Sequence, residues 1–297
     1  MSFHGLVVPL PTIFGADGTL DADGTAAFAL SVAKGGADRL FVLGSLGEFP
    51  LLTREERREV VARTVAMARG SAPVWAGTGA PSTAEAIALS RDAESAGAEA
   101  LVVVPPYYLH PAPGAIERYY RAIRRAVSVP LYAYNIPSLV GYPLDPSLVG
   151  RLGRDGVLAG IKDTSESLAS VETFLRAGPE GFEVMPGDDA LAAPAIARGA
   201  AGAVMGLANV LPRLGRAIVA AAHRGDGAEV VRLQELIEAL AFVVAGGPFP
   251  SAGKFLASRV RGVRVGYRSP CDPLSPEEER RVLARWSAWD GRLKEFA

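Results

Sequence analysis

One lysine of this chain directly follows an apolar run, a position in which an amine could act as a nucleophile. The chain holds 31 lysine and arginine residues in total, and the lysines are Lys34, Lys162, Lys254 and Lys294. Lys162 comes directly after the apolar run 158–161. Arginine stays charged, whereas a buried lysine can lose its proton and attack a carbonyl carbon. The sequence therefore predicts imine chemistry at Lys162; the alternative is a strand-end lysine that reaches solvent.

Tyr134 and Ser45 could complete such a site, since imine chemistry needs a proton relay and an anchor for a carboxylate. Tyr134 ends the apolar run before that of Lys162, and its phenol could move protons. Ser45 lies in the glycine-bounded turn 44–47, where its hydroxyl and the N–H groups of Ser45 and Leu46 could bind an anion. Each residue alone has an ordinary explanation, a core tyrosine or a turn serine. The prediction therefore depends on all three occurring together.

Eight short apolar runs alternate with longer amphipathic stretches over the first 225 residues. The runs are mostly uncharged and bounded by Gly or Pro, as expected for strands that are buried on both faces. Strands that alternate with helices pair in parallel and are joined by right-handed crossovers. The predicted strands are Leu6–Leu10, Leu40–Leu43, Val74–Ala76, Ala100–Val104, Leu131–Tyr134, Leu158–Ile161, Glu183–Met185 and Ala203–Met205.

Two architectures fit this alternation, a closed (β/α)8 TIM barrel and an open doubly wound sheet. The count of eight strands favours the barrel, and the nucleotide motifs of open sheets are incomplete. Gly77-Thr78-Gly79 follows a strand, but Ser82 replaces the third glycine of the dinucleotide motif. Around Gly247–Lys254 the spacing is one residue too long for a phosphate loop, and Phe255 follows the lysine. We expect a barrel, with the site at the C-terminal ends of its strands.

The pattern changes after the barrel region, which we assign to residues 1–225. Residues 226–297 contain no further strand run and are expected to form a C-terminal helical extension packed on the barrel. The expected helices are Ala228–Val244, Ala252–Arg261 and Pro276–Lys294. Nothing between them has the composition of a flexible linker, so we expect a single compact unit.

Charge and composition exclude several classes of function. The net charge of −1 gives no reason to expect nucleic acid or an anionic membrane as a partner. No apolar segment is long enough to span a bilayer, and Met1–Gly5 shows no signal-peptide pattern. A single cysteine, Cys271, fits a reducing cytoplasm, and the three histidines have no partners at metal-ligand spacing. We expect a cytoplasmic protein without a metal site.

Six motifs together resemble those of one family, the dihydrodipicolinate synthase/N-acetylneuraminate lyase family of class I pyruvate-dependent aldolases. The similarity extends from Gly5 through the C-terminal helices. Each motif is moderately specific, and their shared order and spacing make the resemblance strong. The motifs are Gly44–Glu48, Pro105–Tyr108, Tyr134–Ser138, Gly160–Thr164, Pro186–Asp189 and Ala208–Val210.

The resemblance implies a role for each matching residue. Lys162 would form the Schiff base, Tyr134 would relay protons, and Ser45 with the adjoining amides would hold the pyruvate carboxylate and join the relay. Tyr108 would reach into a neighbouring subunit's site, which implies a homodimer or homotetramer. No metal or organic cofactor is implied. The remaining matches are Gly187 and Val204, whose backbones would line the site, and Lys254, which would be structural.

Two departures from the family pattern concern the substrate. Leu46 stands where the family usually has a threonine, so one carboxylate-binding hydroxyl is lost while the backbone amide remains. Leu139 stands where dihydrodipicolinate synthases have an arginine that binds the carboxylate of the second substrate. The chain therefore resembles a 2-keto-3-deoxy sugar acid aldolase more than a true dihydrodipicolinate synthase.

Several related functions remain as alternatives to that aldolase. They are a dihydrodipicolinate synthase, an N-acetylneuraminate lyase, a 4-hydroxy-2-oxoglutarate aldolase and a keto-deoxy acid dehydratase. A pyruvate-binding regulator that has lost turnover is the non-enzymatic alternative. A nucleotide-dependent oxidoreductase is disfavoured because both phosphate motifs are incomplete.

Overall fold

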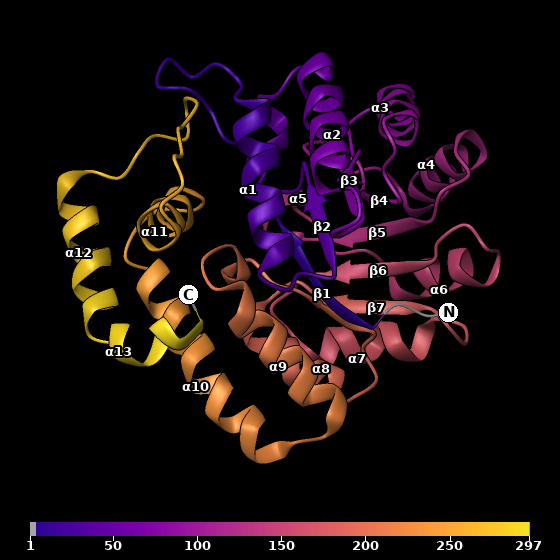
Figure 1. The fold of residues 1–297 in the computed structure, drawn as a ribbon. Coiled ribbons are helices and arrows are strands. Elements are labelled where there is room, and N and C mark those ends of the chain that lie inside the picture. Colours follow the sequence, from indigo (N-terminus) through magenta and orange to yellow (C-terminus); the bar gives the residue numbers. More distant parts are fainter. Residues whose placement is uncertain (1–3, 297) are drawn as a thin grey trace.

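Eight parallel strands form the centre of the molecule in a computed structural model that describes residues 4–296 (Figure 1). The prediction that Met1–Gly5 is not part of a signal peptide falls partly on Met1–Phe3, which lie outside the described residues. The strands are β1 (Gly5–Pro9), β2 (Arg39–Val42), β3 (Val74–Gly77), β4 (Ala100–Val103), β5 (Leu131–Asn135), β6 (Gly160–Asp163), β7 (Glu183–Pro186) and β8 (Gly202–Val204).

The strands close into a barrel. From β1 to β7 each strand pairs in parallel with the next one in the sequence, and β8 pairs in parallel with β1. The circle is completed by the backbone of Ala201, just before β8, whose N–H donates to the carbonyl of Val184 in β7 at 3.0 Å. The predicted (β/α)8 barrel is confirmed, and the open sheet is excluded.

All eight predicted strands are present, and their ends differ from the prediction by one or two residues. The largest shift is in β6, which begins at Gly160 although the apolar run begins at Leu158. The N–H of Leu158 still donates to the carbonyl of Leu152, at 3.2 Å, and Ala159 is the first residue whose N–H reaches Leu131 of β5. Leu158 thus belongs to the turn that ends the preceding helix.

Helices surround the barrel and follow the strands in turn. Side-chain caps fix several of their starts: Thr53 and Glu56 form a reciprocal capping box, and Asp145 accepts from the N–H of Ser147. The helices of the barrel region are α1 (Ala22–Lys34), α2 (Arg54–Ala68), α3 (Thr83–Ser95), α4 (Pro113–Ala126), α5 (Pro137–Val140), α6 (Pro146–Arg154), α7 (Leu168–Ala177), α8 (Ala192–Ile196) and α9 (Pro212–Arg224). Short 3-10 turns, η1 (Phe49–Leu51), η2 (Asp189–Leu191) and η3 (Leu207–Asn209), follow β2, β7 and β8.

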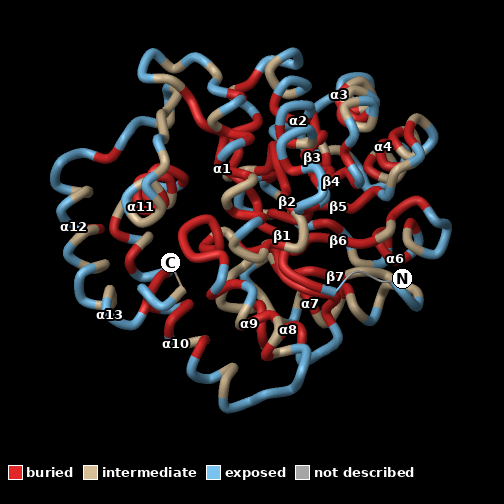
Figure 2. Tube along the Cα trace, in the orientation of Figure 1, coloured by how far each residue is buried: buried red, intermediate tan, exposed pale blue. Residues whose placement is uncertain are grey.

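The strands are almost entirely buried, and the outer faces of the helices are exposed (Figure 2). Large side chains fill the barrel towards the N-terminal ends of its strands. The ring of Trp75 stacks on that of Tyr132 at 4.5 Å, and the Tyr132 hydroxyl donates to Glu183 at 2.7 Å. Tyr134 lies two residues further along β5 and therefore points into the same interior, one layer nearer the C-terminal ends.

The C-terminal helices lie beside the barrel, on the side towards which the arrowheads of β5, β6 and β7 point (Figure 1). They are α10 (Gly227–Val244), α11 (Ser251–Arg261), α12 (Pro276–Ser287) and α13 (Asp290–Leu293), followed by η4 (Lys294–Phe296). The prediction of one helix over Pro276–Lys294 is wrong, because the helix ends at Ser287. After Ser287 the N–H of Trp289 donates to the carbonyl of Trp286, three residues earlier, at 2.9 Å, so the regular four-residue helical spacing is interrupted.

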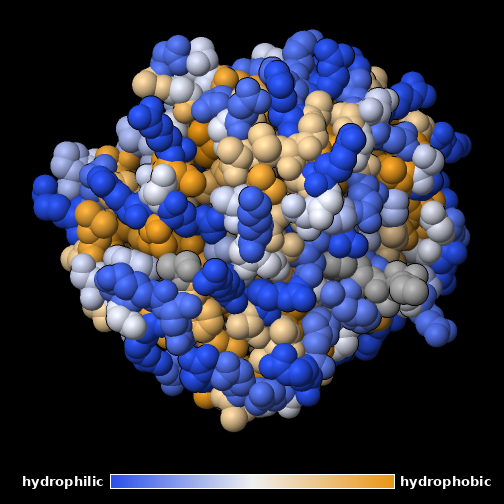
Figure 3. Space-filling view, viewed as in Figure 1, coloured by the Kyte–Doolittle hydropathy of each residue, from blue (hydrophilic) through white to orange (hydrophobic). Residues whose placement is uncertain are grey.

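Hydrophilic side chains cover much of the surface, and apolar atoms gather on the side of α11 and α12 (Figure 3). Within residues 4–296 no helix combines the length and the hydropathy needed to cross a bilayer.

Candidate active site

Lys162 and Tyr134 are direct neighbours inside the barrel. They pair in register across β6 and β5, and each is only 4% exposed. The Nζ atom of Lys162 lies 3.6 Å from the centroid of the Tyr134 ring. The structure therefore places the predicted amine and the predicted phenol side by side, at the C-terminal ends of their strands.

Burial and mutual contact change the acidity of both groups. Burial lowers the pKa of Lys162, although the negative charges of Tyr134 and Asp163 act against this shift. Burial alone would raise the pKa of Tyr134, but the charge of Lys162 and hydrogen bonds from its neighbours outweigh it, so the pKa is lowered. Both shifts favour proton exchange within the pair.

Thr164 is a third member of this cluster, to which the sequence analysis assigned no role. The Nζ of Lys162 donates to Oγ1 of Thr164 at 2.9 Å. Thr164 also lowers the pKa of Tyr134 through a hydrogen bond, after the larger effects of burial and of Lys162. The position of Thr164 beside Lys162 could have been predicted from the sequence, because side chains two residues apart at a strand end point to the same side.

Ser45 joins the cluster from the turn after β2. Its Oγ lies 3.4 Å from the hydroxyl of Tyr134. The turn is closed by a bond from the N–H of Glu48 to the carbonyl of Ser45, at 3.1 Å. The hydroxyl of Thr12, after β1, donates to the carbonyl of Gly47 at 2.6 Å and holds the turn from the other side. Leu46, between these residues, is partly exposed.

Gly187 lies directly over the lysine, at the end of β7. A Cβ atom at this position would lie 2.9 Å from Nζ of Lys162 and 2.1 Å from Oγ1 of Thr164. Such contacts are too close for a side chain, so glycine leaves room above the amine. Lys162, Tyr134, Ser45 and Gly187 are therefore brought together as predicted.

The other predicted lining residues lie in separate elements around this cluster. Val204 is buried in β8, where it pairs with Val7 of β1. Leu139 lies in the short helix α5 and is 60% exposed. Tyr108 follows β4 and is 89% exposed, with a backbone φ of 73°. Aromatic side chains are enriched at contacts between protein chains.

A buried polar network fixes the strand ends behind the cluster. Asn135 and Asp163 are the next register pair after Tyr134 and Lys162, and their side chains are joined at 2.7 Å. The side-chain oxygen of Asn135 also accepts from the N–H of Leu144 at 2.9 Å. These bonds tie β5 to β6 and keep the two reactive side chains in register.

Asp189 is a further residue that the sequence analysis did not single out. Its carboxylate accepts from the N–H groups of Gly206 and Leu207, at 3.2 and 3.0 Å, and so ties the β7 loop to the β8 loop. Removal from water raises the pKa of Asp189 to about 7, although these amide bonds oppose the shift. A single aspartate in a Gly-Asp-Asp run carries no pattern that would reveal this bridge from sequence.

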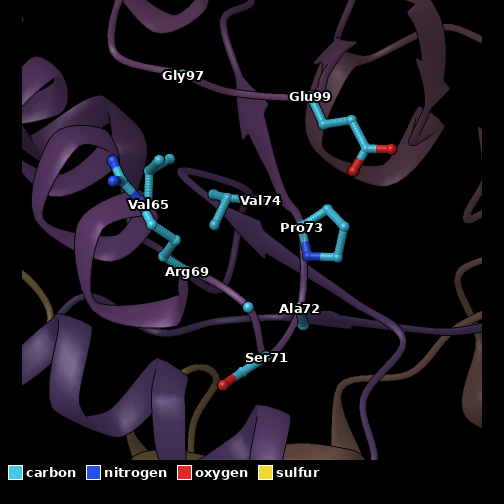
Figure 4. A pocket seen from close by; sticks show the side chains of 9 residues that line it. Val65, Arg69, Ser71, Ala72, Pro73, Val74, Gly97 and Glu99 are labelled. Atoms are coloured by element: carbon cyan, nitrogen blue, oxygen red, sulfur yellow. The ribbon is translucent and has the colours of Figure 1, made fainter.

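A surface hollow at the other end of the barrel does not belong to this site. It has a volume of about 420 Å³ and is lined by residues such as Arg69, Pro73 and Glu99 (Figure 4). It opens where β3 begins, whereas the cluster around Lys162 lies where the strands end. In barrels of this type the chemistry takes place at the C-terminal ends.

Comparisons with known proteins agree with this geometry. Residues 2–288 match the model of the dihydrodipicolinate synthetase family. A DapA-like lyase of Halobacterium salinarum is 38% identical over 286 residues, which cover 96% of this chain and 93% of the relative. A 4-hydroxy-tetrahydrodipicolinate synthase of Chelativorans sp. is 36% identical over 269 residues, covering 90% and 92% of the two chains.

A solved structure is similarly close. YagE, a prophage protein of the dihydrodipicolinic acid synthase family from E. coli K12 solved in complex with pyruvate, superposes with a TM-score of 0.92 at 31% identity. The match covers 97% of this chain and 99% of YagE. The chain therefore belongs to the dihydrodipicolinate synthetase family of lyases.

Proposed function

We propose that this protein is a class I aldolase that makes or cleaves a carbon–carbon bond between pyruvate and an aldehyde, through an imine at Lys162. The observation that carries the proposal is the buried Lys162 amine, 2.9 Å from the Thr164 hydroxyl and directly over the Tyr134 ring. The pyruvate bound to the similar YagE structure supports pyruvate as the common substrate.

In the cleavage direction, Nζ of Lys162 attacks the C2 carbonyl of a 2-oxo-4-hydroxy acid and water leaves. Tyr134 takes the proton of the C4 hydroxyl, the C3–C4 bond breaks, and its electron pair moves into the protonated imine. The aldehyde leaves and an enamine remains. Protonation at C3, followed by hydrolysis, releases pyruvate and the free Lys162 amine. Ser45, 3.4 Å from the Tyr134 hydroxyl, continues the proton relay.

The turn after β2 is the proposed anchor for the carboxylate of the 2-oxo acid. Ser45 offers a hydroxyl, and the N–H groups of Ser45 and Leu46 complete an oriented set of donors. Leu46 supplies no hydroxyl, so this anchor has fewer side-chain donors than a turn with threonine. Gly187 leaves room for the carbon atoms attached to Nζ, and Val204 contributes to the wall at β8.

For the second substrate we propose an uncharged aldehyde, so the cleaved substrate is a 2-oxo-3-deoxy sugar acid. Leu139 supports this choice, because its side chain offers no donor to a carboxylate. The same imine would also serve a 4-hydroxy-2-oxoglutarate aldolase, an N-acetylneuraminate lyase or a keto-deoxy acid dehydratase. A regulator that only binds pyruvate would not need Tyr134 and Ser45 placed beside the amine.

A comparison of two aldehydes tests this proposal. At fixed pyruvate we expect kcat/KM for glyceraldehyde to exceed that for aspartate semialdehyde. An arginine fork holds a carboxylate through two charge-assisted bonds, so its absence is expected to cost aspartate semialdehyde roughly 10²-fold in kcat/KM. If aspartate semialdehyde is better by about tenfold, more than 1 kcal/mol, a different group binds its carboxylate and the argument from Leu139 is wrong.

We further propose a homodimer or homotetramer in the cytoplasm, in which Tyr108 contributes to the site of a neighbouring subunit. Its 89% exposure in the single chain supports this role. The variants Tyr108→Phe and Lys162→Ala should each be inactive alone. Mixed oligomers should recover activity, because one site then contains both native residues. A mixture with verified subunit exchange and no recovery would mean that Tyr108 serves its own chain.

A further inference from the structure

A buried ion pair connects the C-terminal helices to the turn that carries Ser45. Glu48 ends this turn, and its carboxylate pairs with Nζ of Lys254 in α11. We propose that Lys254 and Glu48 are a positioning pair, which sets the orientation of the turn for the carboxylate of the 2-oxo acid. This inference rests on the proposed function, because it concerns how that substrate is held.

The pair is enclosed more completely than a typical ion pair. The side chain of Lys254 is 0% exposed and that of Glu48 is 2% exposed. The Lys254 ammonium also donates to the carbonyl of Gly266 at 3.3 Å and lies 4.9 Å from the ring centroid of Phe14. Burial lowers the pKa of Lys254, while the charge of Glu48 opposes the shift. A buried charge without a partner is costly, so each side chain holds the other in place.

The backbone of Glu48 explains why the turn needs such a restraint. Its φ of 52° and ψ of 36° lie in the left-handed region, which is unfavourable for residues other than glycine. In this conformation its N–H closes the turn onto Ser45, and its carbonyl accepts from Leu51 at 2.9 Å. The ion pair fixes the side chain of Glu48 in the direction that it takes from this left-handed backbone conformation. Release of the pair would let the turn relax and would rotate the N–H groups next to Ser45.

Another contact of the same helix provides a matched control. Arg261, the last residue of α11, donates to the hydroxyl of Ser31 in α1 at 2.7 Å. Its guanidinium also lies 5.6 Å from the ring centroid of Phe28 in α1. Arg261 thus fastens α11 to α1, and neither of these contacts involves the turn of Ser45 and Glu48. Loss of Arg261 should reduce stability without changing the orientation of the turn.

The test measures how much pyruvate is needed to form the imine. Wild-type protein and Lys254→Met are titrated with pyruvate in the presence of borohydride, and labelling of Lys162 is quantified by mass spectrometry. We expect the half-saturating pyruvate concentration of Lys254→Met to rise by roughly 10-fold or more, as for a substrate anchor that is misplaced. The labelling rate at saturating pyruvate should change much less, because the surroundings of Lys162 are intact.

Three further variants separate positioning from stability. The double variant Glu48→Gln/Lys254→Met carries no unpaired charge but also lacks the pair, so its half-saturation should stay raised. A return to within about threefold of wild type would mean that the unpaired charge, and not the loss of the pair, caused the rise in Lys254→Met. Arg261→Met should lower Tm but leave the half-saturation unchanged. Should Lys254→Met not fold, Glu48→Gln serves instead, because a buried lysine can shed its proton; its half-saturation should also rise.

The outcomes distinguish this inference from the proposed function. Normal labelling of the wild type, together with unchanged half-saturation in Lys254→Met and Glu48→Gln, would overturn only the positioning role. If the half-saturation of Lys254→Met and Arg261→Met rises in proportion to their loss of Tm, the pair of Lys254 and Glu48 has only a structural role. If the wild-type protein is never labelled at Lys162, the imine mechanism is wrong, and this inference is wrong as well.

Discussion

Lys162→Met is expected to lower kcat for aldol cleavage by roughly 10⁴-fold or more, the scale on which enzymes lose activity without their nucleophile. Methionine fills the buried channel of the lysine stem but supplies no amine. Without an imine, the electron pair of the breaking bond has no acceptor. The measurement is pyruvate release from a 2-oxo-3-deoxy sugar acid, with folding checked by circular dichroism.

The matched control is Lys34→Met, the same change at an exposed lysine at the end of α1. This variant should keep wild-type kcat, since Lys34 lies at a helix end. Substantial turnover by a folded Lys162→Met variant would show that another group forms the covalent intermediate.

Tyr134→Phe is the change with the second largest expected effect, a fall in kcat of about 10²–10⁴-fold. The ring remains, so its contact with Lys162 and the packing against Phe41 are retained. The proton relay to Ser45 is lost. Imine formation at Lys162 should still be detectable after long incubation with pyruvate and borohydride, because the amine itself is unchanged.

Tyr119→Phe provides the comparison for this variant. Tyr119 is buried in α4, and its hydroxyl accepts from the N–H of Ala80 at 3.2 Å and donates to the carbonyl of Val104 at 3.3 Å. Its loss should reduce Tm and leave kcat near the wild-type value. If Tyr134→Phe keeps full kcat while Tyr119→Phe behaves as expected, Tyr134 is not the proton relay.

Much of the fold can be predicted from the sequence because each strand carries its own signal. Strands buried on both faces read as uninterrupted apolar runs, and Gly or Pro marks their ends. Lys162 and Tyr134 end neighbouring runs of this kind, so parallel pairing alone brings them to one edge of the barrel. The break at Ser287 was missed, because the change to a three-residue bond from Trp289 to Trp286 is a detail of the backbone that the helical pattern does not encode.

The remainder of the site depends on contacts between distant residues. The bond of Asp189 to Gly206 and Leu207 joins two loops, and no periodicity connects them. Lys254 and Glu48 meet only because α11 folds back onto the turn after β2. The family resemblance implied a structural role for Lys254, but only the structure shows that its partner is Glu48. Thr164 differs, since its two-residue spacing from Lys162 already indicated a shared face.

Trapping of the imine tests the central claim most directly. Protein is incubated with pyruvate and borohydride, digested, and the reduced adduct is located by peptide mass spectrometry, with the Lys162→Met variant treated in parallel. Imine chemistry at Lys162 predicts an adduct on Lys162 in the wild-type protein and none in the variant. An adduct on Lys254, or no adduct at all, would contradict it.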